Sequence, residues 1–184
     1  KKRVLAEEQD KYENIEDFLS SLNITIQFNQ LDDYNFSRVL QLINKTNQFN
    51  TTTRCYTEKN LKEMQDDDHF FVGVLGYTDQ MTEFENIGVF IIEQKTDCIN
   101  INTLLLSCRV LGKCLENTIV AWIVNYSRSQ GFDYLCGEII ETSRNTPVRD
   151  IYKKLGFTEE ESGKWCFQTS NKINTPTFIK IGGK

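Results

Sequence analysis

Apolar and polar residues follow two different rhythms along the chain, and the change falls near residue 111. Before it, short apolar runs at 70–77, 87–93 and 98–107 are separated by polar turns that contain Asp or Asn. Such runs are typical of β-strands joined as an antiparallel meander. After it, apolar residues recur at steps of three and four from Leu111 to Tyr126, up to a stop at Gly131. This spacing predicts the strongest helix of the chain.

The other segments complete a domain that mixes strands and helices. Further strands are predicted at 23–28, 133–140, 165–167 and 178–181, and further helices after residue 35, after the N-cap candidate Thr57 and at 147–155. The order strand, helix, strand across residues 98–140 forms a βαβ unit, whose two strands lie parallel. The sequence therefore predicts a single α/β domain with a mixed sheet.

The N-terminal residues 1–22 are basic and then acidic, with an apolar spacing that becomes helical in the second half. We expect them to form a linker and a weakly packed helix ahead of a domain at 23–184. No apolar run approaches the roughly 20 residues that span a bilayer, and no secretory signal is recognisable. We therefore expect a cytoplasmic protein without membrane contact.

Charge is distributed unevenly between the two halves of the chain. The net charge of −5 argues against nucleic acid as a partner, because nucleic-acid binders normally carry a basic excess. Residues 1–103 carry 10 Lys/Arg against 18 Asp/Glu, a net −8, whereas residues 104–184 carry 11 against 8, a net +3. An anionic ligand would therefore be tolerated better in the C-terminal half.

The six cysteines stand singly, without a Cys-x-x-Cys pair, and His69 is the only histidine. Zinc sites use clustered Cys and His ligands, so no metal site is expected. In a cytoplasmic protein of this pattern we expect no disulfide either.

The segment 104–114 runs from a buried strand toward the strongest helix. A junction of this kind directs free backbone N–H groups and the positive end of the helix dipole at one spot, where a phosphate can bind. Gly112 would let a ligand approach the backbone, and Arg109 and Lys113 add positive charge. The alternative is an ordinary strand-to-helix turn with surface cations.

Two motifs in the C-terminal half resemble the GCN5-related N-acetyltransferases (GNAT). Arg109-x-x-Gly112-x-Cys114 resembles their pyrophosphate loop, and Asn145 with Tyr152-x-x-Leu155-Gly156-Phe157 is similar to their later helix. The resemblance implies the GNAT fold, a mixed sheet of about six or seven strands flanked by helices, and a coenzyme A or phosphopantetheine ligand. It implies a pantetheine contact for Asn145, a general-acid role for Tyr152, and ligand binding by Leu106, Ser107, Arg109, Val110, Leu111, Gly112, Lys113 and Cys114. Cys114 departs from the pattern, which has a small residue there.

A narrower resemblance covers residues 18–157. The blocks 41–50, 52–54 and 107–112 are similar to the C-terminal acetyltransferase-like half of the FkbH family. In that family a haloacid-dehalogenase-like domain precedes this half, and the whole loads a glyceryl group onto an acyl carrier protein. The resemblance implies both as partners, and a substrate or carrier contact for Asn47, Gln48 and Arg54, with turn capping as the alternative. The dehalogenase signature Asp-x-Asp-x-Thr/Val is missing from this chain.

Cys108 is the residue predicted to take part in a covalent step. It follows the strand directly, and Arg109 and a helix start would stabilise its thiolate. The hypothesis is that the Cys108 thiol accepts the transferred group before the carrier thiol does. The alternatives are packing roles, as a small core residue for Cys108 and as a helix-end aromatic for Tyr152.

Two other functions remain open on the sequence alone. A free-standing acetyl-CoA-dependent N-acetyltransferase would need a base for its amine, which Glu138 or Glu141 could supply. A non-catalytic module would dock a carrier protein, using Arg109 but requiring neither Cys108 nor Tyr152.

Overall fold

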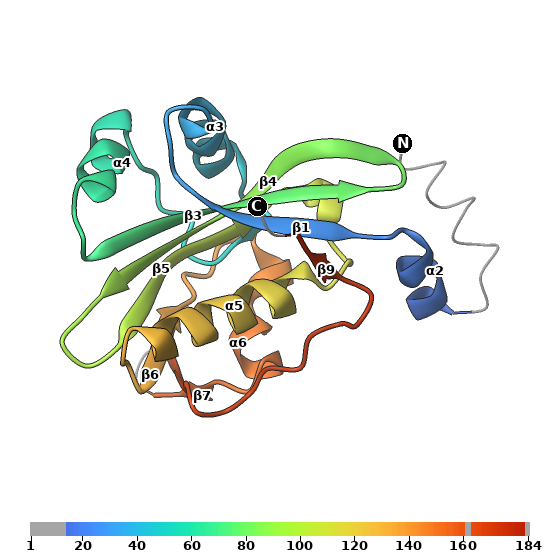
Figure 1. Cartoon of the computed structure of the whole chain (residues 1–184). Helices are drawn as coiled ribbons and strands as arrows, with labels where there is room; N and C mark the ends of the chain where they lie inside the picture. Colours follow the sequence, from blue (N-terminus) through green and yellow to red (C-terminus); the bar gives the residue numbers. More distant parts are fainter. Residues whose placement is uncertain (1–13, 161–162, 183–184) are drawn as a thin grey trace.

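The computed structural model describes residues 14–160 and 163–182, which form one mixed sheet with helices on both faces (Figure 1). The strands are β1 (Thr25–Gln30), β2 (Phe49–Asn50), β3 (Phe70–Asp79), β4 (Thr82–Gln94), β5 (Ile99–Leu106), β6 (Tyr134–Glu138), β7 (Thr158–Glu159), β8 (Lys164–Gln168) and β9 (Lys180–Ile181). The helices are α2 (Ile15–Ser21), α3 (Phe36–Lys45), α4 (Glu58–Gln65), α5 (Leu115–Ser129) and α6 (Ile151–Lys154), with 3-10 turns η1 (Cys108–Val110) and η2 (Thr146–Val148). None of the described helices is long and apolar enough to cross a membrane.

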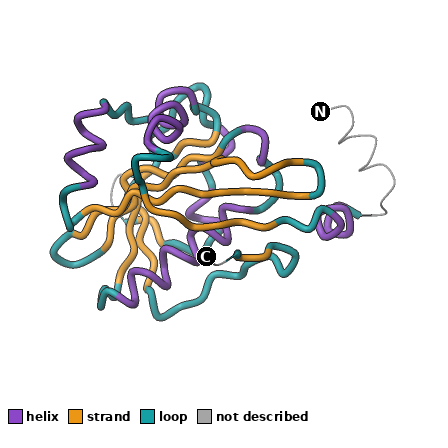
Figure 2. The backbone as a smooth tube through the Cα atoms, turned by 45° about the horizontal axis from the view of Figure 1, so that its top comes forward, coloured by secondary structure: helices purple, strands orange, loops and turns teal. Residues whose placement is uncertain are grey.

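The strands follow the order β7-β8-β6-β5-β4-β3-β1-β9, and β2 pairs with β5 outside this path. Figure 2 shows the long strands running side by side as one layer. Pairing is parallel between β5 and β6 and between β1 and β9, and antiparallel elsewhere in the described sheet. The predicted mixed sheet and βαβ unit are confirmed. The described residues form nine strands. Six of them have five or more residues, in line with the six or seven predicted, and β2, β7 and β9 are additional strands of two residues each.

Each face of the sheet carries its own apolar core. The face under α5 and α6 buries Phe90, Ile101 and Leu104 from the sheet against Ile119 and Ile123 of α5. The opposite face packs against α3 and α4, as Figure 1 shows, through a smaller cluster. The period-two apolar runs of β3, β4 and β5 supply both cores, because successive side chains point to opposite faces.

The strongest predicted helix begins later than its apolar spacing indicated. α5 starts at Leu115 rather than Leu111. Gly112 and Cys114 have φ values of +81° and +56°, in the left-handed region that a right-handed helix cannot include. Residues 107–114 therefore form a loop that contains the turn η1. Cys108 lies near the beginning of this loop and not at the start of α5.

The predicted N-terminal helix packs more closely than expected over its described part. Residues 1–13 lie outside the described residues, but α2 buries Phe18 and Leu19 in the core under α5, and Leu22 follows them there. Asn14 caps the helix by accepting from the Asp17 N–H at 2.8 Å. The boundary at Leu22 therefore stays a prediction, and the described helix before it packs into the same core as the sheet.

The expectation of no disulfide is wrong for one pair. Cys136 on β6 and Cys166 on β8 are neighbours in the antiparallel ladder and are joined by a disulfide. Opposite residues of adjacent strands bring their Cβ atoms close, and the Cα atoms here are 4.1 Å apart. Single cysteines 30 positions apart gave no such indication in the sequence.

The strands β5 and β6 separate after a short parallel ladder. Their pairing runs from Ile99 opposite Leu135 to Ile101 opposite Gly137 and goes no further. Beyond that point β5 pairs instead with β2, with Asn50 opposite Leu105 and Phe49 opposite Leu106. The opening between two central strands is therefore filled by a segment that comes from the connection between α3 and α4.

Candidate functional site

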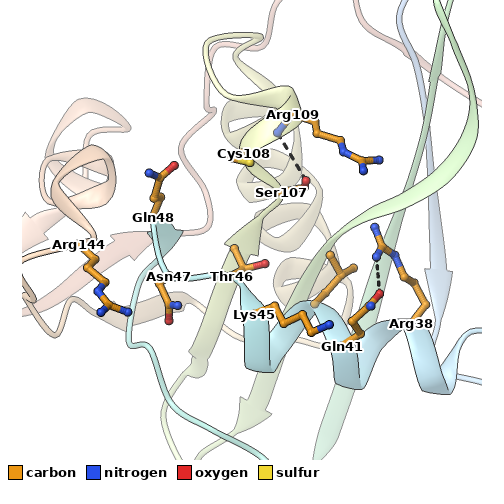
Figure 3. Close-up of a pocket in the computed structure, with 11 residues that line it drawn as sticks. Arg38, Gln41, Lys45, Thr46, Asn47, Gln48, Ser107, Cys108, Arg109 and Arg144 are labelled. Atoms are coloured by element: carbon orange, nitrogen blue, oxygen red, sulfur yellow. Dashed lines mark hydrogen bonds between the residues drawn. The ribbon is translucent and has the colours of Figure 1, made fainter. Parts of the chain in front are cut away.

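A pocket of about 470 Å³ lies where β5 ends and η1 begins (Figure 3). Its lining comes from α3, from the segment that follows α3, from the first residues after β5 and from the loop before η2: Arg38, Gln41, Leu42, Lys45, Thr46, Asn47, Gln48, Ser107, Cys108, Arg109 and Arg144. The structure thus brings together five residues predicted from the sequence. These are Asn47, Gln48, Ser107, Cys108 and Arg109.

The charge of this pocket is positive. Arg38, Lys45, Arg109 and Arg144 line it, and none of its described lining residues is acidic. In Figure 3, Arg144 lies to one side of the group and Arg38 and Arg109 to the other, with Cys108 and Thr46 between them. Four cations around one pocket favour an anionic ligand.

Cys108 presents the exposed thiol of this pocket. It is the first residue of η1, and Ser107 caps that turn by accepting from the Arg109 N–H at 3.5 Å. The Ser107 N–H in turn donates to the Ile87 carbonyl at 2.7 Å, which fixes the end of β5 on β4. Burial raises the pKa of the two half-buried thiols, Cys98 and Cys114, which makes them poorer nucleophiles.

The segment that fills the sheet opening is held by hydrogen bonds on both sides. The Thr51 N–H donates to the Leu104 carbonyl of β5 at 3.0 Å, and the Ile140 N–H beyond β6 donates to the Thr51 carbonyl at 2.9 Å. The hydroxyl of Thr51 accepts from the Leu104 N–H, and that of Thr52 donates to the Asn102 carbonyl. Asn50, Thr51 and Thr52 are buried. The segment therefore behaves as an internal strand of the sheet.

Asn145 secures this strand from the far side. Its side-chain amide is fully buried, and its two N–H groups donate to the Asn50 carbonyl at 3.0 Å and to the Ile140 carbonyl at 2.9 Å. Its oxygen accepts from the Thr142 N–H at 2.8 Å. Both donors of the residue predicted to touch a pantetheine arm are thus used on the protein's own backbone.

Tyr152 lies behind the same strand. Its ring is fully buried against Phe157, with ring centroids 4.9 Å apart, and beneath Gly137, where a Cβ atom would come within 2.5 Å of the Tyr152 hydroxyl. Burial raises the pKa of Tyr152 well above its ordinary value, although the Thr51 side chain acts against this. A general acid has to reach the leaving group of a ligand, whereas the Tyr152 hydroxyl is buried in this arrangement. The general-acid role therefore stays a prediction.

Lys113 is not directed into the pocket. Its ammonium lies 2.7 Å from the Asp79 carboxylate and also donates to the Tyr77 hydroxyl, while Tyr77 donates to Asp79. Only 10% of the Lys113 side chain and 1% of the Asp79 side chain are exposed. Lys113 therefore anchors the loop 107–114 to the end of β3 instead of offering a free charge to a ligand.

The other predicted loop residues differ in their surroundings. Leu106 and Val110 belong to the apolar core, and Leu111 packs partly against it. Gly112 is exposed, and a Cβ atom added there would meet nothing within 4 Å, so a ligand could approach its backbone. Cys114 is half-buried as the N-cap of α5.

The start of α5 carries an acidic residue of its own. Glu116 lies in its first turn, and burial raises the pKa of this carboxyl. It lines a cavity of about 90 Å³ together with Phe49 of the inserted strand and Lys154. A carboxylate there interacts with the helix dipole and opposes a second anion. The positive pocket therefore lies at Ser107 to Arg109 and not at the helix start.

Arg54 lies apart from Asn47 and Gln48. It forms an ion pair with Glu138 and lines a second pocket, of about 560 Å³, with Glu93, Asp97 and other residues. Glu141, the other base considered for an amine, lies 3.3 Å from Arg149. Among the described residues no group of three His, Cys, Asp or Glu side chains is placed to hold a metal ion.

Arg38, Lys45 and Arg144 were missed by the sequence analysis. Arg38 and Lys45 lie on the polar side of α3, where charges normally indicate only a solvated face. Arg144 follows the strand β6 and belongs to the basic C-terminal half, which was the one available signal. Nothing local to these residues shows that the fold brings them together.

Comparison with known proteins shows the fold. No protein-family model and no curated protein matches the sequence. A ribosomal-protein alanine N-acetyltransferase from Escherichia coli superposes with a TM-score of 0.59 at 13% identity, covering 78% of this chain and 94% of that one. The spermidine N-acetyltransferase of Vibrio cholerae, in complex with CoA and spermine, gives 0.58 at 13% identity, covering 79% and 96%. A GNAT-family protein from Desulfovibrio desulfuricans gives 0.59 at 14% identity, covering 78% and 99%.

These likenesses define the class to which the architecture belongs. The α/β sandwich with its separating central strands has the fold of an acyltransferase domain. It is the GNAT fold predicted from Arg109, Gly112 and the later helix. At this level of identity the fold alone is shown, and fold does not decide the reaction.

The residues present fit a phosphopantetheine donor only in part. The positive pocket suits its phosphate groups, and Gly112 leaves room beside the loop. The pantetheine arm of such a donor does not fit between β5 and β6 in this arrangement, because residues 49–52 occupy the opening between these strands. A thioester donor whose phosphate groups bind in this pocket would therefore have to place its thioester outside that opening.

Proposed function

We propose that the domain is an acyltransferase whose donor is a phosphopantetheine thioester, carried by coenzyme A or an acyl carrier protein, and whose first acceptor is the Cys108 thiol. One observation carries the proposal. The exposed thiol lies in a pocket lined by four cations, while the opening in the adjacent sheet is filled by residues 49–52. Cys108 is thus the nucleophile that a phosphate-bound donor can reach.

The transfer is a thioester exchange. The Cys108 sulfur forms a bond to the acyl carbon, the bond from that carbon to the carrier sulfur breaks, and the proton lost by Cys108 balances the one gained by the carrier thiol. Arg109 and Arg144 line the same pocket as Cys108 and supply positive charge for the phosphate groups of the donor. A second exchange passes the acyl group to the final acceptor.

The more specific proposal is that the donor or acceptor is an acyl carrier protein and that a dehalogenase-like domain precedes this one in a parent chain. It rests on the resemblance of blocks 41–50 and 107–112 to the FkbH family, and Asn47 and Gln48 in the pocket are consistent with it. None of the three structural neighbours described above is named as acting on a carrier protein. Turnover with acyl carrier protein well above that with acetyl-CoA is the expected result.

Replacing the thiol tests the proposal. After incubation with acetyl-CoA or acetylated carrier protein, the intact mass is expected to rise by one acetyl group, and peptide mapping should place it on Cys108. Cys108→Ser should reduce transfer by on the order of 1,000-fold, as removal of other nucleophiles does. Cys55→Ser is the matched control, because Cys55 is also exposed but lies outside the pocket.

The assignment would be contradicted if the Cys108→Ser protein still gained an acetyl group, or if Cys55→Ser lost as much transfer activity as Cys108→Ser. Unchanged transfer in Cys108→Ser would point to direct transfer to an amine, as the activities named for the structural neighbours suggest. Glu138 in the second pocket is the base that this candidate would use, although it is paired with Arg54 in this arrangement. Acetylation of an amine that requires Glu138 but not Cys108 would support it.

A docking module without catalysis is the remaining candidate. It predicts that Arg109→Gln weakens binding of the carrier protein while Cys108 and Tyr152 can be replaced without effect. Calorimetry with coenzyme A and with carrier protein, beside the mass measurement, separates it from both acyltransferase candidates.

A further inference from the structure

A carboxylate of the chain itself lies beside the positive pocket and contacts two of its cations. Glu85 projects from β4, and its Oε2 lies 2.7 Å from the guanidinium of Arg109 and 4.0 Å from that of Arg38. The Glu85 side chain is 23% exposed, so this contact is partly shielded from solvent. Two of the four cations around the pocket are thus held by one internal anion.

The other two cations have no such partner. Neither Lys45 nor Arg144 forms an ion pair or a side-chain hydrogen bond within the described part of the chain, and both line the pocket. Arg38 is further oriented by a hydrogen bond to the Gln41 side chain at 2.6 Å and by donation to the Asn86 carbonyl. Two cations are therefore positioned in advance, and two remain unpaired.

We propose that Glu85 is an internal counter-ion, which the phosphate groups of a phosphate ester or pyrophosphate bound in this pocket displace from Arg38 and Arg109. The ligand class follows from the charges: guanidinium groups bind phosphate oxygens in pairs, and several cations around one pocket suit a ligand with more than one negative charge. The same charges would repel a polyamine such as spermidine.

The inference deepens the proposed function, because the phosphates would belong to the acyl donor, but it can fail separately. It needs no acyl transfer and no change at Cys108. Its specific content is that Glu85 competes with the ligand for two of the four cations. Removing the carboxylate should therefore strengthen binding, whereas removing an unpaired cation should weaken it.

The test is calorimetric titration of the full chain with inorganic pyrophosphate and, separately, with coenzyme A. Glu85→Gln keeps the size of the side chain and removes its charge, and we expect binding tighter by roughly 3- to 10-fold. Glu83→Gln is the matched control on the same hairpin, because it removes the same charge from an exposed residue that has no described ion pair. Arg144→Gln should weaken binding by about 10-fold.

Equal affinities in Glu85→Gln and Glu83→Gln would overturn the counter-ion role, and unchanged binding in Arg144→Gln would overturn the site. Binding of coenzyme A but not pyrophosphate in all variants would also overturn it, because recognition would then not be of phosphate. If pyrophosphate binding follows the expected order while Cys108 is never acylated, the anion site stands and the proposed function fails.

Discussion

Asn145→Ala is expected to lower the free energy of unfolding by about 3 kcal/mol. The Asn145 amide makes three hydrogen bonds inside the protein, and its removal leaves the buried carbonyl of Asn50 and the partly buried carbonyl of Ile140 without that donor. An unsatisfied buried polar group costs roughly 1–3 kcal/mol. Urea unfolding followed by circular dichroism measures the change, with the slope of the transition showing whether the unfolding stays two-state.

Asn125→Ala is the control for this substitution, because Asn125 is exposed on α5 and accepts only a 3.4 Å hydrogen bond from Arg128. It should leave the midpoint of unfolding nearly unchanged. If Asn145→Ala unfolds like the control and its only effect is weaker binding of coenzyme A, then Asn145 is a ligand contact, as the GNAT resemblance implied. The inserted strand would then not depend on it.

Asp79→Asn is expected to destabilise the protein by about 3–5 kcal/mol. The substitution leaves the buried ammonium of Lys113 without its counter-charge, and breaking one half of a buried ion pair has a cost of this size. The loop 107–114 should loosen as well, since Lys113 fastens it to β3. Urea unfolding gives the first effect, and faster reaction of Cys108 and Cys114 with a thiol reagent gives the second.

Glu58→Gln provides the comparison, since the ion pair of Glu58 and Lys62 has the same 2.7 Å separation but is exposed on α4. We expect almost no change in stability, because exposed pairs are screened by solvent. If both variants lost a similar free energy of unfolding, burial of the Asp79–Lys113 ion pair would not add to its contribution to stability.

The stability difference between the wild type and Asp79→Asn is expected to depend on pH. Burial alone would raise the pKa of Asp79, but hydrogen bonds from Lys113, Tyr77 and the Met81 N–H outweigh it and hold that pKa below its ordinary value. A carboxyl with a lowered pKa in the folded state stabilises the protein above its ordinary pKa, near 4, and loses this contribution as pH falls through the folded value. The stability difference between the wild type and Asp79→Asn should therefore shrink in acid.

The sequence predicted the regular elements well where their signal is local. Thr57 caps the start of α4 as expected, and the apolar runs at 70–77 and 98–107 became β3 and β5. The start of α5 was misplaced because apolar spacing continues through the left-handed residues Gly112 and Cys114. Periodicity reports which side chains face the core, and it does not report backbone conformation.

The site was predicted less completely, because its decisive contacts join distant parts of the chain. Residues 49–52 look like a polar turn, and their place between β5 and β6 depends on Asn145, 95 positions after Asn50. Lys113 was taken for a ligand-binding cation, since its partner Asp79 lies 34 positions earlier. Cys108 and Arg109, which do line the pocket, were chosen as candidates because their signal, a strand end beside a glycine turn, is local.

Amide hydrogen exchange at Thr51 and Ile140, followed by NMR with and without saturating coenzyme A, tests the central claim most directly. These two N–H groups tie the inserted strand to β5 and to the end of β6. If residues 49–52 are an internal strand that keeps the donor on the side of Cys108, both amides should be as protected as those of β4, and coenzyme A should leave them so. Rapid exchange in the free protein, or loss of protection when coenzyme A binds, would contradict the claim.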